Sequence, residues 1–164
     1  MEVKSPKSDT KTDVSPQRHA NMAAIHSKDT KPEMMVRRYL WHKGFRYRIN
    51  DKRLPGRPDI VLSSYHTVIF IHGCFWHAHE GCKHFRVPKT NQAFWEAKFA
   101  RNKERDLRDH EQLRRMGWNI LTIWECQLRD HPQETLQDIE NVLLKNFLII
   151  HRAAARMVPD NPKD

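Results

Sequence analysis

The stretch HGCFWHAHEGC, residues 72–82, contains several side chains that bind metal ions or move protons. Cys74, His79 and Cys82 are good zinc ligands within one short loop, and Cys126 can supply a fourth from just beyond a predicted strand. These ligands predict a tetrahedral zinc site of three cysteines and one histidine. The alternative is that the cysteines are small buried apolar side chains and the histidines are solvated loop residues.

A closed four-ligand shell has no open position for a substrate, so this zinc would be structural and would pin an irregular loop to the end of a sheet. Chemistry must then come from other residues. His72 and His77 are candidates to activate water or stabilise a phosphate, because imidazole titrates near neutral pH and serves as a general base or a hydrogen-bond donor. Phe75 and Trp76 lie between the ligands, where they are either core aromatics or rings that the metal holds outward.

The elements that must position these residues follow from local patterns. Thr30-Lys31-Pro32-Glu33 has the form of a capping box, and the apolar stripe after it ends at Gly44. FRYRI alternates apolar and basic residues, and the β-branched runs PDIVL and TVIFIH follow it. The predicted order is a helix over 31–43, strands over 45–49, 58–62 and 67–72, a helix over 91–116, a strand over 119–124, and a last helix that Asp130 and Pro132 open and that runs to about residue 154. We therefore expect a mixed α/β sandwich.

Composition narrows the class of protein. The 164 residues carry 29 Lys and Arg against 20 Asp and Glu, a net charge of +9, which favours a polyanionic partner such as nucleic acid. No apolar run has the length of a membrane span and the N-terminus lacks the apolar core of a secretory signal, so we expect no membrane partner and a cytoplasmic location. Three cysteines in such a chain argue against a disulfide framework. We predict that residues 1–20 form a flexible basic arm, that residues 21–155 form a single domain, and that residues 156–164 form a flexible tail.

Five stretches, in one order, resemble those of the very short patch repair (Vsr) DNA mismatch endonucleases of bacteria: NMAAIHSKDTKPE, LPGRPDIV, VIFIHGCFWH, FWEAKFARNKERD and GWNILTIWEC. The resemblance implies a fold like that of type II restriction nucleases, a mixed β-sheet flanked by helices. It also implies a magnesium-dependent enzyme that nicks double-stranded DNA 5′ to the thymine of a T:G mismatch, the product of 5-methylcytosine deamination. On the same basis we expect a monomer associated with the nucleoid, with mismatch-repair proteins of the MutL type as partners.

The resemblance assigns Asp59 to magnesium, with the backbone carbonyl of Ile71 as the second protein ligand, because the second acidic residue and the lysine usual in restriction nucleases are missing from TVIFIH. Magnesium commonly takes one or two carboxylates and fills its octahedron with waters and phosphate oxygens. The resemblance also makes His77 the general base. Without it, Asp59 would be interpreted as a residue that closes a turn.

Two acidic residues receive catalytic roles in the same way. Asp106 matches a position that orients a histidine, and Glu33 matches an active-site glutamate. Each also has a plainer explanation, because Asp106 lies in the charged run RNKERDLRD and Glu33 completes the capping box. One departure from the family pattern concerns zinc: HAHEGC carries an extra residue before Cys82, which leaves His77 as an alternative to His79 as the zinc ligand.

Mismatch recognition requires a sensor of weak base stacking, and an apolar wedge is the simplest one. Phe75, Trp76 and Trp95 match intercalating aromatics of the family, and Met22 matches a residue inserted from the opposite groove. The predicted helix 91–116 would connect wedge and catalytic centre, because these residues share one of its faces: Trp95, Phe99, Asn102 and Asp106. The alternative is that Trp95 and Phe99 are the core stripe of that helix.

Two other functions fit many of the same residues. A non-catalytic zinc-stabilised DNA-binding module would keep the aromatics, the zinc ligands and the basic charge, but would not need Asp59 or His77. A site-specific restriction endonuclease of the same fold stays open as well, because no recognition sequence can be read from the chain. The presence of Asp59 and His77 favours the mismatch endonuclease over the binding module.

Overall fold

The computed structural model describes residues 28–156, with side chains described to residue 152. The chain divides into two units, Met1–Thr30 and Lys31–Asp164, and every described element belongs to the second. No helix among the described residues is both long and apolar enough to cross a bilayer. The elements are α2 (Lys31–His42), β1 (Ile60–Leu62), the 3-10 turn η1 (Ser63–Tyr65), β2 (Thr67–His72), α3 (Gln92–Arg115), β3 (Asn119–Trp124), α4 (Glu125–Asp130) and α5 (Pro132–Arg156).

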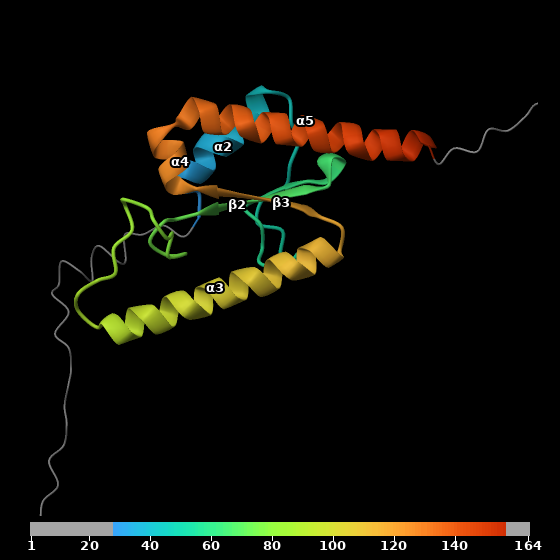
Figure 1. Cartoon of the computed structure of the whole chain (residues 1–164). Helices are drawn as coiled ribbons and strands as arrows, with labels where there is room; N and C mark the ends of the chain where they lie inside the picture. Colours follow the sequence, from blue (N-terminus) through green and yellow to red (C-terminus); the bar gives the residue numbers. More distant parts are fainter. Residues whose placement is uncertain (1–27, 157–164) are drawn as a thin grey trace, which may run out of the picture. The chain divides into compact units, whose positions relative to one another are not determined.

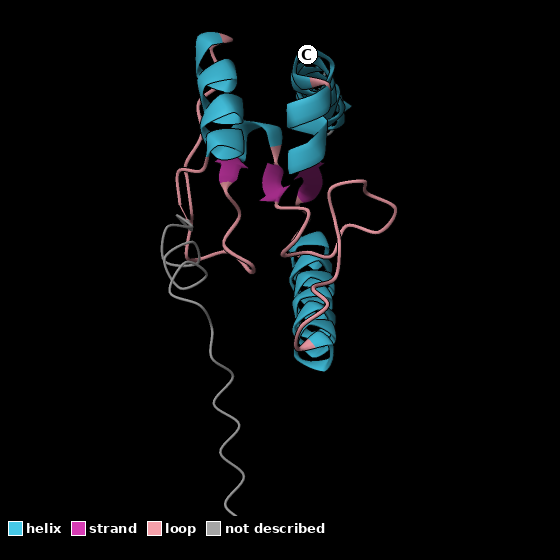
Figure 2. Cartoon of the chain, turned by 90° about the vertical axis from the view of Figure 1, so that its left-hand side faces the viewer, coloured by secondary structure: helices cyan, strands magenta, loops and turns pink. Residues whose placement is uncertain are grey.

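The sheet has β2 at its centre. β2 pairs antiparallel with β1, with Ile60 opposite Ile69, and parallel with β3, with His72 opposite Trp124. A parallel pair needs a long crossover connection, and α3 lies within it. Within the second unit, α2, α4 and α5 cover one face of the sheet and α3 covers the other (Figure 1, Figure 2). The mixed α/β class expected from the sequence is thereby confirmed.

Alternation along the strands divides the apolar side chains between two cores. Ile60 and Ile69 face α2, α4 and α5, in a core that also contains Val36, Leu40, Phe45, Leu62, Ile123, Leu128, Leu136, Ile139 and Leu143. Val68 and Phe70 face the α3 side, in a core that also contains Val61 and Leu113. His72 continues the row of Val68 and Phe70, so the pleat of β2 directs this buried imidazole toward α3.

The predicted strand over 45–49 is wrong. Phe45 is buried and Tyr47 is half-buried, so the apolar alternation exists, but the only pairing of this segment in the described chain is a single bridge between Arg48 and Val61. Two backbone hydrogen bonds of 2.9 and 2.8 Å make that bridge. Asn50 then adopts a φ of 48°, which turns the backbone away from β1 before a ladder can form.

The other elements differ from their predicted bounds by small amounts, with one addition. The strand predicted over 58–62 begins at Ile60, and the two long helices end within two residues of expectation. The addition is α4, a short helix that follows β3 directly, before the last predicted helix. It buries Leu128, and the side-chain oxygen of Gln127 accepts the Trp124 N–H at 2.8 Å, which satisfies a donor at the start of the helix.

Candidate active site

The candidate site lies at one edge of the sheet, where three chain segments meet. β2 and β3 are parallel, so His72 and Trp124 end their strands side by side. β1 runs the opposite way, so Asp59, which precedes it, lies beside the end of β2. The Ile71 N–H donates to Asp59 Oδ2 at 2.7 Å and fixes the orientation of that carboxylate. The strand register therefore brings Asp59 and His72 to the same edge.

Asp59 is a largely buried carboxylate with a second acidic residue nearby. Burial, together with the negative charge of Glu33, raises the pKa of Asp59 to about 6 despite the hydrogen bond from Ile71. Glu33 is itself buried, and its Oε2 accepts a hydrogen bond of 2.8 Å from Arg37 Nη2. The same Nη2 donates to the carbonyl oxygen of Asp59 at 3.4 Å. A bound cation would stabilise the ionised form of such a carboxylate.

His77 and Asp106 form a hydrogen-bonded pair beside Asp59. Nδ1 of His77 lies 2.5 Å from Asp106 Oδ2, and both side chains are about one-fifth exposed, so solvent reaches them. Burial works against ionisation of Asp106, but hydrogen bonds from His77 and Arg105 outweigh it and lower the pKa of Asp106. With a carboxylate on Nδ1, the other ring nitrogen of His77 is the one that can accept a proton from a water molecule.

The ring of His72 stacks against the ring of His77, with centroids 3.7 Å apart and planes within 9°. Burial, with repulsion from His77, lowers the pKa of His72 to about 3, so this imidazole is neutral. Ligand atoms of His72, His77 and Asp106 lie within 4.8 Å of one another, a separation that would also fit a metal ion. The parallel rings argue against that, because imidazole lone pairs lie in the ring plane and stacked rings cannot direct theirs at one ion.

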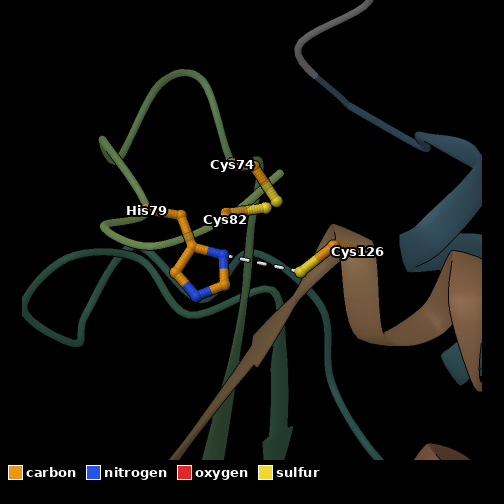
Figure 3. Close-up of side chains that lie close together, drawn as sticks. All are labelled: Cys74, His79, Cys82 and Cys126. Atoms are coloured by element: carbon orange, nitrogen blue, oxygen red, sulfur yellow. Dashed lines mark hydrogen bonds between the residues drawn. The ribbon is translucent and has the colours of Figure 1, made fainter. Parts of the chain in front are cut away.

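A second cluster lies on the other side of the same loop. Cys74, His79, Cys82 and Cys126 place their ligand atoms within 4.8 Å of one another, and Figure 3 shows the four side chains converging. Cys126 Sγ lies 3.5 Å from His79 Nδ1, close to the edge of about 3.6 Å expected for a tetrahedron with zinc bond lengths of 2.0 to 2.3 Å. All three cysteines are free, and burial raises the pKa of Cys74 to about 12. This donor set fits zinc, which binds thiolates and neutral imidazole.

His77 and His79 are two positions apart on the loop, yet they belong to different clusters. His77 pairs with Asp106, whereas His79 joins the cysteines and stacks on Trp124, with ring centroids 3.8 Å apart. Between them Ala78 has a φ of 45°, in the left-handed region, and Gly81 follows with a φ of 72°. These conformations reverse the chain around the cluster. The structure thus groups His79 with the predicted zinc ligands, and His77 apart from them.

Aromatic rings gather between this loop and the first half of α3. Phe75 contacts Trp76, Trp95 and Phe99 edge-on, with centroid distances of 5.1, 5.1 and 5.4 Å. Phe99 is buried, as a core residue would be, whereas Trp76 and Trp95 are partly exposed. The Lys98 ammonium lies 5.2 Å from the Trp76 ring and 5.6 Å from the Trp95 ring. The two tryptophans thus present accessible ring surface beside a cation.

α3 links this aromatic group to the histidine and carboxylate pair. Asn102 Nδ2 donates to the backbone oxygen of Trp76 at 2.8 Å, one turn of helix before Asp106 contacts His77. The face of α3 predicted from the sequence therefore contacts both regions.

Met22, predicted to enter DNA from the opposite groove, lies outside the described residues. Arg37 was not singled out from the sequence, although its spacing of four residues from Glu33 on a helix is a recognisable ion-pair signal.

One edge of the mixed sheet carries a largely buried carboxylate, a histidine paired with a second carboxylate, and accessible tryptophans. In a chain of net charge +9, these features define a hydrolase suited to a polyanionic phosphodiester substrate. Comparison with known proteins identifies the family. A model described as DNA mismatch endonuclease Vsr matches residues 9–84. The chain is 46% identical over 118 residues to the DNA mismatch endonuclease Vsr of Escherichia coli strain K12, which is 72% of this chain and 75% of that protein.

Two further relatives are named type II nicking enzymes. One, from Neisseria meningitidis serogroup A, is 51% identical over 109 residues, which cover 66% of this chain and 77% of that protein. Another, from Xanthomonas oryzae, is 43% identical over 109 residues, with 66% and 79% covered. The chain belongs to the Vsr family of DNA mismatch endonucleases.

Proposed function

We propose that this protein nicks double-stranded DNA on the 5′ side of the thymine of a T:G mismatch, with magnesium, on a restriction-nuclease-like fold. The observation that carries the proposal is the juxtaposition of Asp59 with the His77–Asp106 pair at one sheet edge, beside accessible tryptophans. A module that only bound DNA would have no use for a carboxylate whose pKa burial raises to about 6. Family membership supports the same reaction class.

Asp59 and the carbonyl of Ile71 are the proposed protein ligands of magnesium. The Ile71 N–H donates a hydrogen bond to one carboxylate oxygen of Asp59, so the two residues lie next to each other. Both offer the hard oxygen ligands that magnesium prefers. When bound, magnesium would polarise the scissile phosphate and stabilise charge on the leaving oxygen. Glu33, held by Arg37 near Asp59, is proposed to keep the negative charge of the site high.

His77 is proposed to remove the proton from the attacking water. Its Nδ1 is engaged by Asp106, which fixes the tautomer and stabilises the imidazolium that forms. The proton therefore moves from water to the free ring nitrogen of His77. His72, neutral and stacked on His77, is suited to donate a hydrogen bond to the phosphate rather than to carry charge.

Phe75, Trp76 and Trp95 are the proposed wedge. Insertion of a ring between base pairs costs least where stacking is already weak, as at a mismatch. Within the protein, Trp76 and Trp95 contact each other and Phe75. Insertion of their rings into DNA would replace these ring contacts with stacking on bases. Met22 keeps its proposed role from the opposite groove.

Zinc bound by Cys74, His79, Cys82 and Cys126 is proposed to be structural, because four protein ligands leave no open position. We further propose that residues 21–155 form one nuclease domain that acts as a monomer in the bacterial cytoplasm, with proteins of the MutL type as partners. Each of these features can be tested by a measurement other than nicking.

The second candidate is nicking at a defined sequence without a mismatch, since several relatives bear the name type II nicking enzyme. Matched duplexes with T:G and T:A at the same position distinguish the two. We expect magnesium-dependent nicking of the T:G duplex only, in the thymine strand, with Asp59→Ala inactive but binding the mismatch nearly as well as the parent protein. Equal nicking of both duplexes would favour the second candidate, and parallel loss of binding and activity in Asp59→Ala would make Asp59 a structural residue.

A further inference from the structure

Arg37 is a buried cation at the acidic end of the site. Its side chain is 5% exposed and that of Glu33 is 8% exposed, so their ion pair is shielded from solvent. Arg37 lies on α2 between Val36 and Leu40, and the described part of α2 packs into the core through those two apolar residues. Charged side chains are almost never fully buried unless they are paired, and the carboxylate of Glu33 is a partner that allows the burial of Arg37.

The contacts of Arg37 connect two acidic residues. Its Nη2 donates to Glu33 Oε2 at 2.8 Å and to the backbone oxygen of Asp59 at 3.4 Å, so one nitrogen bridges a side chain of α2 and the segment that enters β1. The backbone oxygen of Arg37 also accepts a hydrogen bond of 2.9 Å from Tyr47. The short bond to Glu33 and the longer one to Asp59 place one guanidinium nitrogen between the Glu33 carboxylate and the backbone of Asp59.

Fold stability alone is a weak reason for such an arrangement. A buried ion pair contributes little net stability compared with apolar side chains of the same volume, since desolvation of both charges offsets their attraction. An apolar residue at position 37 with a neutral partner at 33 would therefore pack at least as well. The charge is more useful to the site, where Glu33 and Arg37 act on Asp59 with opposite signs.

We propose that Arg37 is a positioning residue for the nicking reaction, whose guanidinium holds Glu33 and the Asp59 backbone in fixed relation and limits the attraction of the two acids for a divalent cation. This inference rests on the proposed magnesium site at Asp59. The sequence TVIFIH lacks the lysine usual in restriction nucleases, and Arg37 supplies a buried positive charge from a different element. If the carboxylates of Glu33 and Asp59 both bound the cation tightly, they would occupy coordination positions that phosphate and water need.

The test compares three variants in zinc-replete protein, with Mn²⁺ as the probe. Mn²⁺ binding to the free protein is followed by electron paramagnetic resonance, and nicking of a T:G duplex is measured separately. Arg37→Met removes the positive charge and its bond to Glu33, so we expect Mn²⁺ to bind about tenfold more tightly while nicking falls by about a hundredfold. Arg37→Lys keeps the charge but not the fork, and we expect Mn²⁺ affinity within about threefold of the parent and intermediate nicking.

Glu33→Gln combined with Arg37→Met returns the site to its parent net charge. Mn²⁺ affinity should return to within about threefold of the parent, while nicking stays low because the clamp is absent. Melting curves of each variant report the folded fraction, so lost activity can be separated from lost protein. Unchanged Mn²⁺ affinity in Arg37→Met, or a nicking loss that matches its loss of folded protein, would overturn the proposal. Asp59→Asn tests the premise independently, because Mn²⁺ binding that survives this change would reject the magnesium site itself.

Discussion

His77 and His79 lie on the same loop, yet they belong to opposite kinds of site. His79 lies in a cluster of soft ligands from two segments of the chain, which one metal ion would close completely. His77 lies in an open arrangement with one carboxylate partner and access to solvent. A closed site can contribute to the free energy of folding but not to bond cleavage, and an open one does the reverse. The same residue type therefore has its function decided by what surrounds it.

Zinc removal should have the largest effect, because loss of the fold would remove the His77 site together with the cysteine cluster. His79→Ala, or chelation followed by cysteine blocking, is expected to abolish cooperative unfolding, because apparent binding free energies of structural zinc are about 10 to 16 kcal/mol. Elemental analysis of protein purified without chelator should give one zinc per chain, and none in the variant. A parent protein that holds no zinc and still unfolds cooperatively would remove the metal from this cluster.

His77→Ala should affect only the open site. We expect nicking to fall by about 10² to 10⁴-fold, the usual contribution of a general base, with zinc content and melting temperature close to the parent values. Asp106→Asn should produce part of the same loss, since it weakens the bond that orients His77. Loss of zinc from His77→Ala would instead exchange the roles of the two histidines.

The tryptophans test whether the aromatic group is a wedge or a core. Trp76→Ala and Trp95→Ala are each expected to weaken binding to T:G duplex by about 1 to 3 kcal/mol more than binding to paired duplex, because only a weakly stacked step accepts a ring cheaply. Phe99→Ala is the matched control, since Phe99 is buried and should lose about 3 to 5 kcal/mol of fold stability instead. Titrations at one fixed salt concentration separate the cases. Equal losses on both duplexes with early melting would make a tryptophan a core residue.

The smallest expected effect concerns Asp59 in the absence of magnesium. Its pKa of about 6 in the folded protein lies above the value of about 3.9 in unfolded chains, so the folded state holds this proton more tightly. Stability from Asp59 is thus greatest below about pH 4 and declines as pH rises through about 6. In zinc-replete protein without added magnesium, Asp59→Asn should melt a few degrees above the parent at about pH 8 and by a smaller margin at about pH 5. A variant that melts earlier at both values would contradict the burial effect.

Sequence reasoning found the elements with strong local patterns and failed where tertiary contacts decide. α3 was predicted over 91–116 and runs from Gln92 to Arg115, because a long amphipathic period ended by a glycine is a local signal. The strand over 45–49 failed because its apolar alternation serves burial of Phe45, not ladder pairing. α4 is too short for a periodic pattern, since it spans Glu125–Asp130 directly after a strand.

The candidate site shows the same division. Residue types and spacing proposed the zinc ligands, with His79 among them, and the family resemblance gave Asp59, His77 and Asp106 their catalytic roles. The sequence left His77 open as an alternative zinc ligand to His79. That assignment depends on the backbone of Ala78, and a left-handed alanine has no signal in the sequence. Arg37 has one signal in the sequence, its spacing of four residues from Glu33, but such pairs on a helix are normally solvated and the sequence does not show that this one is buried.

The proposed zinc ligands Cys74 and Cys126 would close the chain into a ring if one metal ion bound both. Each follows the end of a strand, β2 or β3, and the chain between them is the crossover that contains α3. A metal bound there closes a ring of about fifty residues through the helix that carries Trp95 and Asp106. That helix would then be fastened at both ends by one ion. A force applied by bending DNA against the tryptophans would be transmitted to the sheet through this ring rather than fraying α3 away from it.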